Sequence, residues 1–169
     1  MSVSSVATLQ PATALFREEQ YFDWRVYALI ASVEALTALG ILRVSVWSHE
    51  LLLGIAAGSG LLLILAIFLL HMTTEVTPTD IRVWFAWVPV YRRIVPLHEV
   101  RRVEPASFRP VSDYGFWGIR TGRDGERALI ARGNRGVRLE LTDGSLLVIG
   151  SQRPEELALA IQSALRPPA

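Results

Sequence analysis

Residues 51–70, LLLGIAAGSGLLLILAIFLL, form a stretch of twenty residues without one ionisable side chain. As an α-helix this stretch would be about 30 Å long, close to the hydrocarbon thickness of a bilayer. A helix that is apolar on every side requires deep burial in protein or contact with lipid. A chain of 169 residues offers little protein to bury it. The stretch therefore predicts a membrane-spanning helix.

Residues 26–42 form a second apolar stretch, shorter and interrupted by polar residues. Tryptophan and arginine flank it on both sides, as is typical of membrane interfaces. The polar interruptions are Ser32, Glu34 and Thr37, and the flanking residues are Trp24, Arg25, Arg43 and Trp47. The link 43–50 is short enough for an antiparallel helical pair. We therefore expect residues 26–70 to form a two-helix transmembrane hairpin.

Arginine placement indicates the orientation of this hairpin. Arg17, Arg25 and Arg82 lie near the ends on the side of the chain termini, whereas Arg43 alone lies in the link. Because cytoplasmic loops carry an excess of basic residues, we expect a multi-pass protein of the inner cell membrane. Its N-terminus and its C-terminal domain would both be cytoplasmic.

The residues before the hairpin divide into two segments. Residues 1–15 are small and polar and predict a flexible tail. Residues 16–25, FREEQYFDWR, mix charges with four large aromatic side chains. Aromatic rings favour the headgroup level of a membrane, so this segment is expected to lie at the interface.

After residue 71 the pattern changes to short β-like runs separated by turn residues, with the segment 109–114 as a loop. In residues 137–142 apolar and polar side chains alternate, as in a half-buried strand. Residues 154–165 predict a C-terminal helix that opens on Pro154 and has an apolar stripe of Leu157, Ile161 and Leu165. The strands are expected at 72–76, 81–87, 91–95, 100–107, 116–120, 127–131, 137–142 and 146–150.

Several pieces together resemble bacterial two-span membrane proteins that carry a pleckstrin-homology-like (PH-like) domain. They are FREEQYF before the first span, TEVTPTDIRVWF after the second, and YGFWGIR and GVRLELTDGSLLVIGSQRPEELALAI near the end. The resemblance implies an all-β domain at 72–169, about seven antiparallel strands in a bent sheet or barrel, capped by the C-terminal helix. Eukaryotic PH domains hold phosphoinositides with a basic loop between their first two strands. The corresponding turn here, 77–80, has no basic residue.

No motif indicates catalysis. The chain has no cysteine, its three histidines are scattered, and neither HExxH nor GxSxG occurs. We therefore expect no enzyme, no catalytic residue, no cofactor and no metal site. The net charge is +1, and acidic neighbours balance the arginines of the sheet region, which argues against a nucleic-acid partner.

Small residues on the two predicted spans indicate helix packing. Gly54 and Gly58 recur at helical spacing on one span, and Ala31 and Ala35 on the other. These faces meet either within one hairpin, which we favour, or between two chains of a homo-oligomer. Glu34 lies at the middle of its span, where a charge costs roughly 2.5–3.5 kcal/mol. It is expected to be neutral and hydrogen-bonded, with Ser59 at a similar depth.

Residues 83–91, VWFAWVPVY, are apolar on both faces of a strand and precede two arginines. Either protein covers both faces, or one side contacts lipid beside the spans. The second interpretation makes an aromatic hairpin with a basic end, suited to anionic headgroups. The contact residues would be Trp84, Trp87, Tyr91, Arg92 and Arg93.

Two functions follow from these features. The first is an integral membrane protein that presents a PH-like binding or scaffold domain at the cytoplasmic membrane surface, where it meets a protein partner or lipid. The alternative is a small oligomeric membrane protein that acts in transport or signalling through its paired spans and Glu34.

Overall fold

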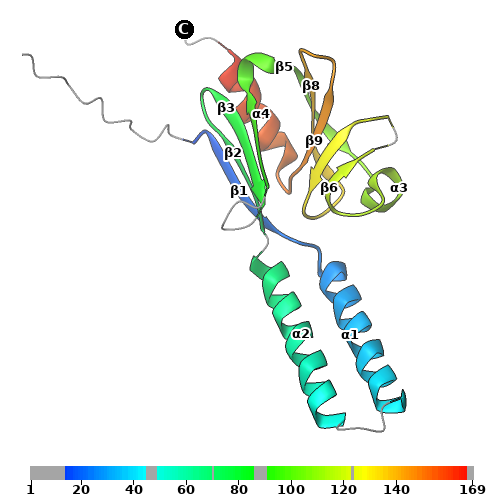
Figure 1. The fold of residues 1–169 in the computed structure, drawn as a ribbon. Helices are drawn as coiled ribbons and strands as arrows, with labels where there is room; N and C mark the ends of the chain where they lie inside the picture. Colours follow the sequence, from blue (N-terminus) through cyan, green and yellow to red (C-terminus); the bar gives the residue numbers. More distant parts are fainter. Residues whose placement is uncertain (1–13, 45–48, 70, 86–90, 123, 167–169) are drawn as a thin grey trace, which may run out of the picture.

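Nine strands, four α-helices and one short 3-10 helix form the part of the chain that this computed structural model describes, residues 14–44, 49–69, 71–85, 91–122 and 124–166. The described chain is largely β and ends in a helix (Figure 1). In order the elements are β1 (Phe16–Tyr21), α1 (Trp24–Val44), α2 (His49–Leu69), β2 (His71–Val76), β3 (Asp80–Phe85), β4 (Tyr91–Pro96), η1 (Leu97–Glu99), β5 (Val100–Ser107), α3 (Pro110–Tyr114), β6 (Gly118–Thr121), β7 (Arg127–Ile130), β8 (Arg135–Leu141), β9 (Leu146–Gly150) and α4 (Pro154–Leu165).

The strands make two sheets. The first has the order β1-β2-β3-β4, and each neighbouring pair is antiparallel. The second has the order β5-β8-β9-β7-β6, in which β7 and β9 are parallel and the other pairs antiparallel. The expectation of about seven strands, all antiparallel, is therefore wrong in number and in direction. Alternation along a sequence identifies the faces of a strand but not its neighbour or its direction.

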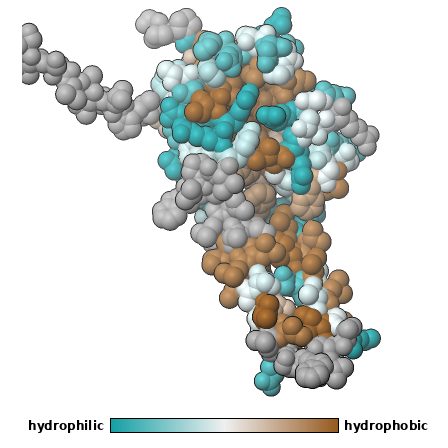
Figure 2. Space-filling model, viewed as in Figure 1, coloured by the Kyte–Doolittle hydropathy of each residue, from teal (hydrophilic) through white to brown (hydrophobic). Residues whose placement is uncertain are grey.

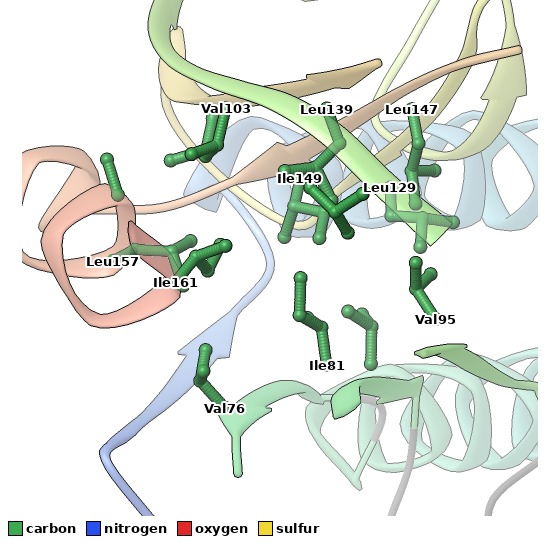
Figure 3. Close-up of a cluster of buried hydrophobic side chains, with 14 of the residues drawn as sticks. Val76, Ile81, Val95, Val103, Leu129, Leu139, Leu147, Ile149, Leu157 and Ile161 are labelled. Atoms are coloured by element: carbon green, nitrogen blue, oxygen red, sulfur yellow. The ribbon is translucent and has the colours of Figure 1, made fainter. Parts of the chain in front are cut away.

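The hydrophobic core lies between the two sheets and α4 (Figure 3). Ile81 and Val95 from the first sheet face Leu139 and Ile149 from the second, and all four are at most 1% exposed. Helix α4 has the bounds that the sequence predicts, and its fully buried Leu157 and Ile161 complete the core. Leu165, at the end of the helix, is 36% exposed, whereas Ala158 beside Leu157 is 3% exposed and joins the core.

The two long helices are inserted between neighbouring strands of the first sheet. Strands β1 and β2 pair from Phe16 opposite Val76 to Tyr21 opposite His71, and α1 and α2 occupy the connection between them. The segment predicted as a membrane interface, 16–25, thus begins as a sheet strand. The β domain is also not confined to 72–169, because it includes β1. Sequence patterning missed β1 because its inward positions include Glu18 and Gln20, which are polar.

Because β1 precedes the helices, the turn at 77–80 has a different place in the sheet from the one expected. This turn joins β2 to β3, so it is the second connection of the sheet and not the first, which is the helical pair. The segment 109–114, expected as a loop, also differs, because Pro110–Tyr114 forms the short helix α3 with its proline at the start. Proline fits the first turn of a helix, because the N–H groups there have no partner within the helix.

Helices α1 and α2 lie side by side and project away from the β domain (Figure 1). Their surface is mostly apolar, as Figure 2 shows below the β domain. The exposed large apolar side chains on the two helices include Leu29, Val33, Leu36, Leu39, Ile55, Leu61, Leu62 and Leu65. By length and composition, Trp24–Ile41 is the one helix among the described residues apolar enough to cross a membrane, and the second apolar stretch, Leu52–Leu65, is shorter.

Candidate functional site

Aromatic side chains gather at the end of the first sheet that adjoins the helices. The rings of Tyr21 and His71 are 5.8 Å apart between centroids, those of Phe22 and Phe85 6.2 Å, and those of Phe85 and Tyr91 6.3 Å. Phe85 is buried, whereas Trp24 at the start of α1 is 67% exposed. Some aromatic rings at the boundary between the β domain and the helical pair are therefore buried and others are exposed, as is typical where apolar and polar surroundings meet.

The residues of β3 alternate between the two faces of the sheet. This alternation shows which described residues of the apolar run 83–91 face the core and which face outward. Val83 and Phe85 face the core and are at most 4% exposed, whereas Trp84 lies on the outer face. Arg92 on β4 is the cross-strand partner of Trp84, so the two share the outer face. Trp87 lies outside the described residues.

A shallow cavity of about 240 Å³ marks this outer face, lined by Glu75, Arg82, Trp84 and Arg92. Arg82 forms an ion pair with Asp80, 2.6 Å between Nε and Oδ1. That guanidinium, with the hydroxyls of two neighbouring threonines, lowers the pKa of Asp80. The outer face therefore combines an indole ring with charges of both signs, an arrangement suited to polar headgroups.

Arg93 lies on the other face of β4 from Arg92. Its cross-strand partner is Val83, whose side chain is buried in the core. The two arginines that the sequence analysis grouped as one membrane contact thus point to opposite sides of the sheet. Successive residues of a strand always do so, and only the register decides which of them is inward.

Between α1 and α2 lies an apolar groove of about 530 Å³. It is lined by Ala31, Glu34, Ala35 and Ala38 from α1 and by Leu53, Ala56, Ala57, Gly60, Leu61 and Ile64 from α2. Ala31 and Ala35 therefore line the α1 side of this groove. The inward α2 residues Leu53, Ala56, Ala57 and Gly60 follow one another at helical spacing.

The glycines expected to pack the helices are the wrong ones. A Cβ atom on Gly54 or Gly58 would meet nothing within 4 Å, whereas one on Gly60 would lie 3.0 Å from Cγ of Glu34. Ser59 donates a hydrogen bond to the carbonyl oxygen of Ala56, 2.9 Å away, and not to Glu34. Gly60 lies two residues after Gly58, which places it about 200° further around the helix.

A polar cluster that the sequence analysis missed lies at the far side of the second sheet. Tyr114 donates a 2.6 Å hydrogen bond to Oε2 of Glu126, and Nε of Arg138 donates one of 2.6 Å to Oε1. Tyr114 is 7% and Glu126 9% exposed. Burial and the Glu126 carboxylate raise the pKa of Tyr114, so its phenol stays protonated at neutral pH. Both carboxylate oxygens of Glu126 accept hydrogen bonds. These contacts therefore hold α3, the β6–β7 connection and β8 together.

A second buried carboxylate joins β1 to the start of α4. Glu18 is 7% exposed and accepts hydrogen bonds from the Ser151 hydroxyl at 2.6 Å and the Gln152 N–H at 3.0 Å. Gln20, on the same face of β1, donates to the Gly150 carbonyl oxygen at 2.9 Å. We call Glu18, Ser151 and Gln152 the β1 latch. Its partners are more than 130 residues apart in sequence, so no local pattern points to it.

Among the described residues, no group of three histidine, cysteine, aspartate or glutamate side chains could hold a metal ion. In comparisons with known proteins, no family model matches this chain, and no curated protein matches it.

Proposed function

We propose that this protein is an integral membrane protein that holds a PH-like binding or scaffold domain against the cytoplasmic surface of the inner membrane. One observation carries the proposal: a helical pair with an apolar surface is inserted between β1 and β2, which are neighbours in one sheet. Only residues 22–23 separate β1 from α1, and only residue 70 separates α2 from β2. A bilayer around the helices would therefore hold the first sheet close to its headgroups.

The apolar side chains of the helical pair support membrane insertion on energetic grounds. None of the 18-residue window Trp24–Ile41 is buried inside the protein. Exposed apolar surface costs about 25 cal/mol per Å² in water, whereas lipid removes this cost. Glu34 is half-buried against Gly60 in the interior groove of the pair, and acidic residues within membrane spans face protein in the same way.

Two further features support a binding module. Two packed sheets with a closing C-terminal helix agree with a PH-like architecture, although the second sheet has a parallel pairing and the helices interrupt the first. The outer face near the helices offers Trp84 and Arg92 to anionic headgroups. A protein partner would meet the remaining exposed surface of the domain.

Replacing the helical pair tests membrane anchoring. Residues 22–70 are exchanged for Asn-Gly, which favours the two-residue turn of a β-hairpin, so that Tyr21 and His71 flank the turn and β1 and β2 stay paired in their register. We expect the parent chain to remain in the membrane pellet after alkaline carbonate extraction, and the shortened chain to be soluble and folded by circular dichroism. A parent chain that carbonate releases contradicts the proposal. A fragment starting at residue 73 is a poor substitute, because it lacks β1.

Headgroup contact is tested with single cysteines, since the chain has none of its own. Arg92→Cys and, on the exposed side of α4, Leu159→Cys are labelled with a fluorophore in the full-length protein reconstituted into bilayers. Lipids with a nitroxide on the headgroup should quench the label at position 92 and leave position 159 unaffected. Equal quenching at both positions would show that the outer face does not adjoin the membrane.

The groove between the helices favours a second candidate, an oligomer that acts in transport or signalling through Glu34. No side-chain hydrogen bond joins Glu34 to another described residue, and Glu34 lines the groove between the helices. An added helix could cover it. Disulfide trapping of Ala38→Cys between chains in native membranes would support this candidate, and a monomer with Glu34 accessible only to lipid would exclude it.

A further inference from the structure

Two arginines line a cavity between the sheets. This cavity is separate from the outer face of β3 and β4 described above. The cavity has a volume of about 270 Å³ and is lined by Arg93, Arg127, Gly125, Ser145 and the leucines at the adjoining ends of β8 and β9. Arg93 reaches it from β4 and Arg127 from the first position of β7, opposite Leu147. Both charges in its lining are therefore positive.

Neither arginine is neutralised within the described part of the chain. Eight other arginines form ion pairs with carboxylates, but no side-chain hydrogen bond or ion pair joins Arg93 or Arg127 to another described residue. Nε of Arg93 is buried and unpartnered. A buried donor without an acceptor costs about 1–3 kcal/mol. A ligand that supplies an acceptor would remove this cost.

The carboxylate of Asp143, on which the charge of Arg93 acts, does not supply this acceptor. Asp143 belongs to the turn between β8 and β9 and accepts the Ser145 N–H at 2.8 Å. The hydrogen bonds from Ser145 are the main reason that the pKa of Asp143 is lowered, and the charge of Arg93 contributes least. Asp143 therefore stays engaged with its own turn and leaves the Arg93 guanidinium open to a ligand.

We propose that this cavity binds a phosphate group, held by the guanidinium groups of Arg93 and Arg127. Guanidinium groups match the oxygens of phosphate with two parallel hydrogen bonds, and two of them balance the charge of a dianion. The Ser145 hydroxyl is a third donor at the cavity wall. The leucines provide an apolar side for the rest of the ligand. This inference goes beyond the proposed function, because a phosphate site needs no membrane.

The phosphate could belong to a lipid headgroup or to a soluble compound, and the test separates the two. Full-length protein is purified in a maltoside detergent, which contains no phosphate. Its melting temperature and affinity are measured with inorganic phosphate and with short-chain phosphatidic acid, against sodium chloride at equal ionic strength. Binding of phosphatidic acid alone assigns a lipid headgroup, and equal binding of inorganic phosphate assigns a soluble ligand.

Three variants decide whether the cavity is responsible. Arg93→Gln and Arg127→Gln should each weaken binding by at least about tenfold, since each removes charge-assisted hydrogen bonds. Arg102→Gln removes an exposed arginine of β5 that pairs with Glu104 outside the cavity, and this variant should bind as the parent does. No stabilisation by either phosphate probe, or equal weakening in the Arg102 and Arg93 variants, would overturn the proposal.

Discussion

Breaking the β1 latch should destabilise the β domain far more than removing the next carboxylate along the same strand. The change is Glu18→Ala, with Glu19→Ala as the matched control. Glu18 faces inward and is 7% exposed, whereas the Glu19 side chain is 46% exposed and pairs with Arg17 at 2.8 Å on the surface. Both variants remove one carboxylate from β1, so they differ only in the face that is changed.

The expected magnitude follows from the contacts of Glu18. Its carboxylate accepts two hydrogen bonds, at 2.6 Å from the Ser151 hydroxyl and at 3.0 Å from the Gln152 N–H. A hydrogen bond to a charged group is worth about 1.5–3 kcal/mol, and the donors left behind are buried or half-buried. Relief of the desolvation of the carboxylate offsets part of this loss. We therefore expect Glu18→Ala to cost about 3 kcal/mol and Glu19→Ala less than about 0.5 kcal/mol.

The assay is thermal unfolding of the full-length protein in detergent, followed by the near-ultraviolet circular dichroism of aromatic side chains. Trp117 is 6% exposed and packs in a hydrophobic cluster with residues of the second sheet, so its signal reports the β domain. A loss of about 3 kcal/mol corresponds to a fall of roughly 10 °C in a domain of this size. Equal melting temperatures for the Glu18 and Glu19 variants would refute the latch.

For three other substitutions the structure predicts the direction of the change in stability. Gly60→Leu should lower the melting temperature of the helical pair in detergent by overpacking its interior, at about 1–3 kcal/mol, whereas Gly58→Leu should not. Asp80→Asn should cost about 1 kcal/mol of unfolding free energy at pH 7. Because the pKa of Asp80 is lowered in the folded state, its contribution is present above about pH 4 and lost as the pH falls toward the folded value, so urea titrations of parent and variant should converge. Gly136→Ala should cost about 3 kcal/mol in urea unfolding, because its Cβ would lie 2.9 Å from Cα of Gly150 across the β8–β9 pair.

The candidate sites illustrate how far patterns can lead. On α1, the small residues Ala31 and Ala35 line the groove that faces α2. The spacing of small residues misassigned the face of α2, because a GxxxG pattern shows that a close approach is possible but not where the neighbour lies. The basic pair at the start of β4 was visible in the sequence. Its division between an outer face and a cavity was not, because the register to β3 decides it.

Some elements were determined by the sequence alone, because their cause is local. The apolar stretches around residues 26–42 and 51–70 became α1 and α2 with bounds shifted by one or two residues. Helix α4 has its predicted bounds, since proline, first-turn acids and the spacing of Leu157 and Ile161 all act within one helix. Alternation likewise predicted a strand at 137–142, which covers most of β8, and the apolar run expected as a strand at 146–150 has the bounds of β9.

Only the tertiary structure decided how β1 belongs to the fold. Its inward residues Glu18 and Gln20 resemble the polar positions of an exposed strand or an interfacial segment. They are buried because their partners, at Gly150 and Ser151, approach from the other end of the chain. A buried polar group is stable only where a donor or acceptor pairs with it. Here the partners are so far away in sequence that no local pattern identifies them. The insertion of the helical pair into the first sheet depends on the same long-range pairing.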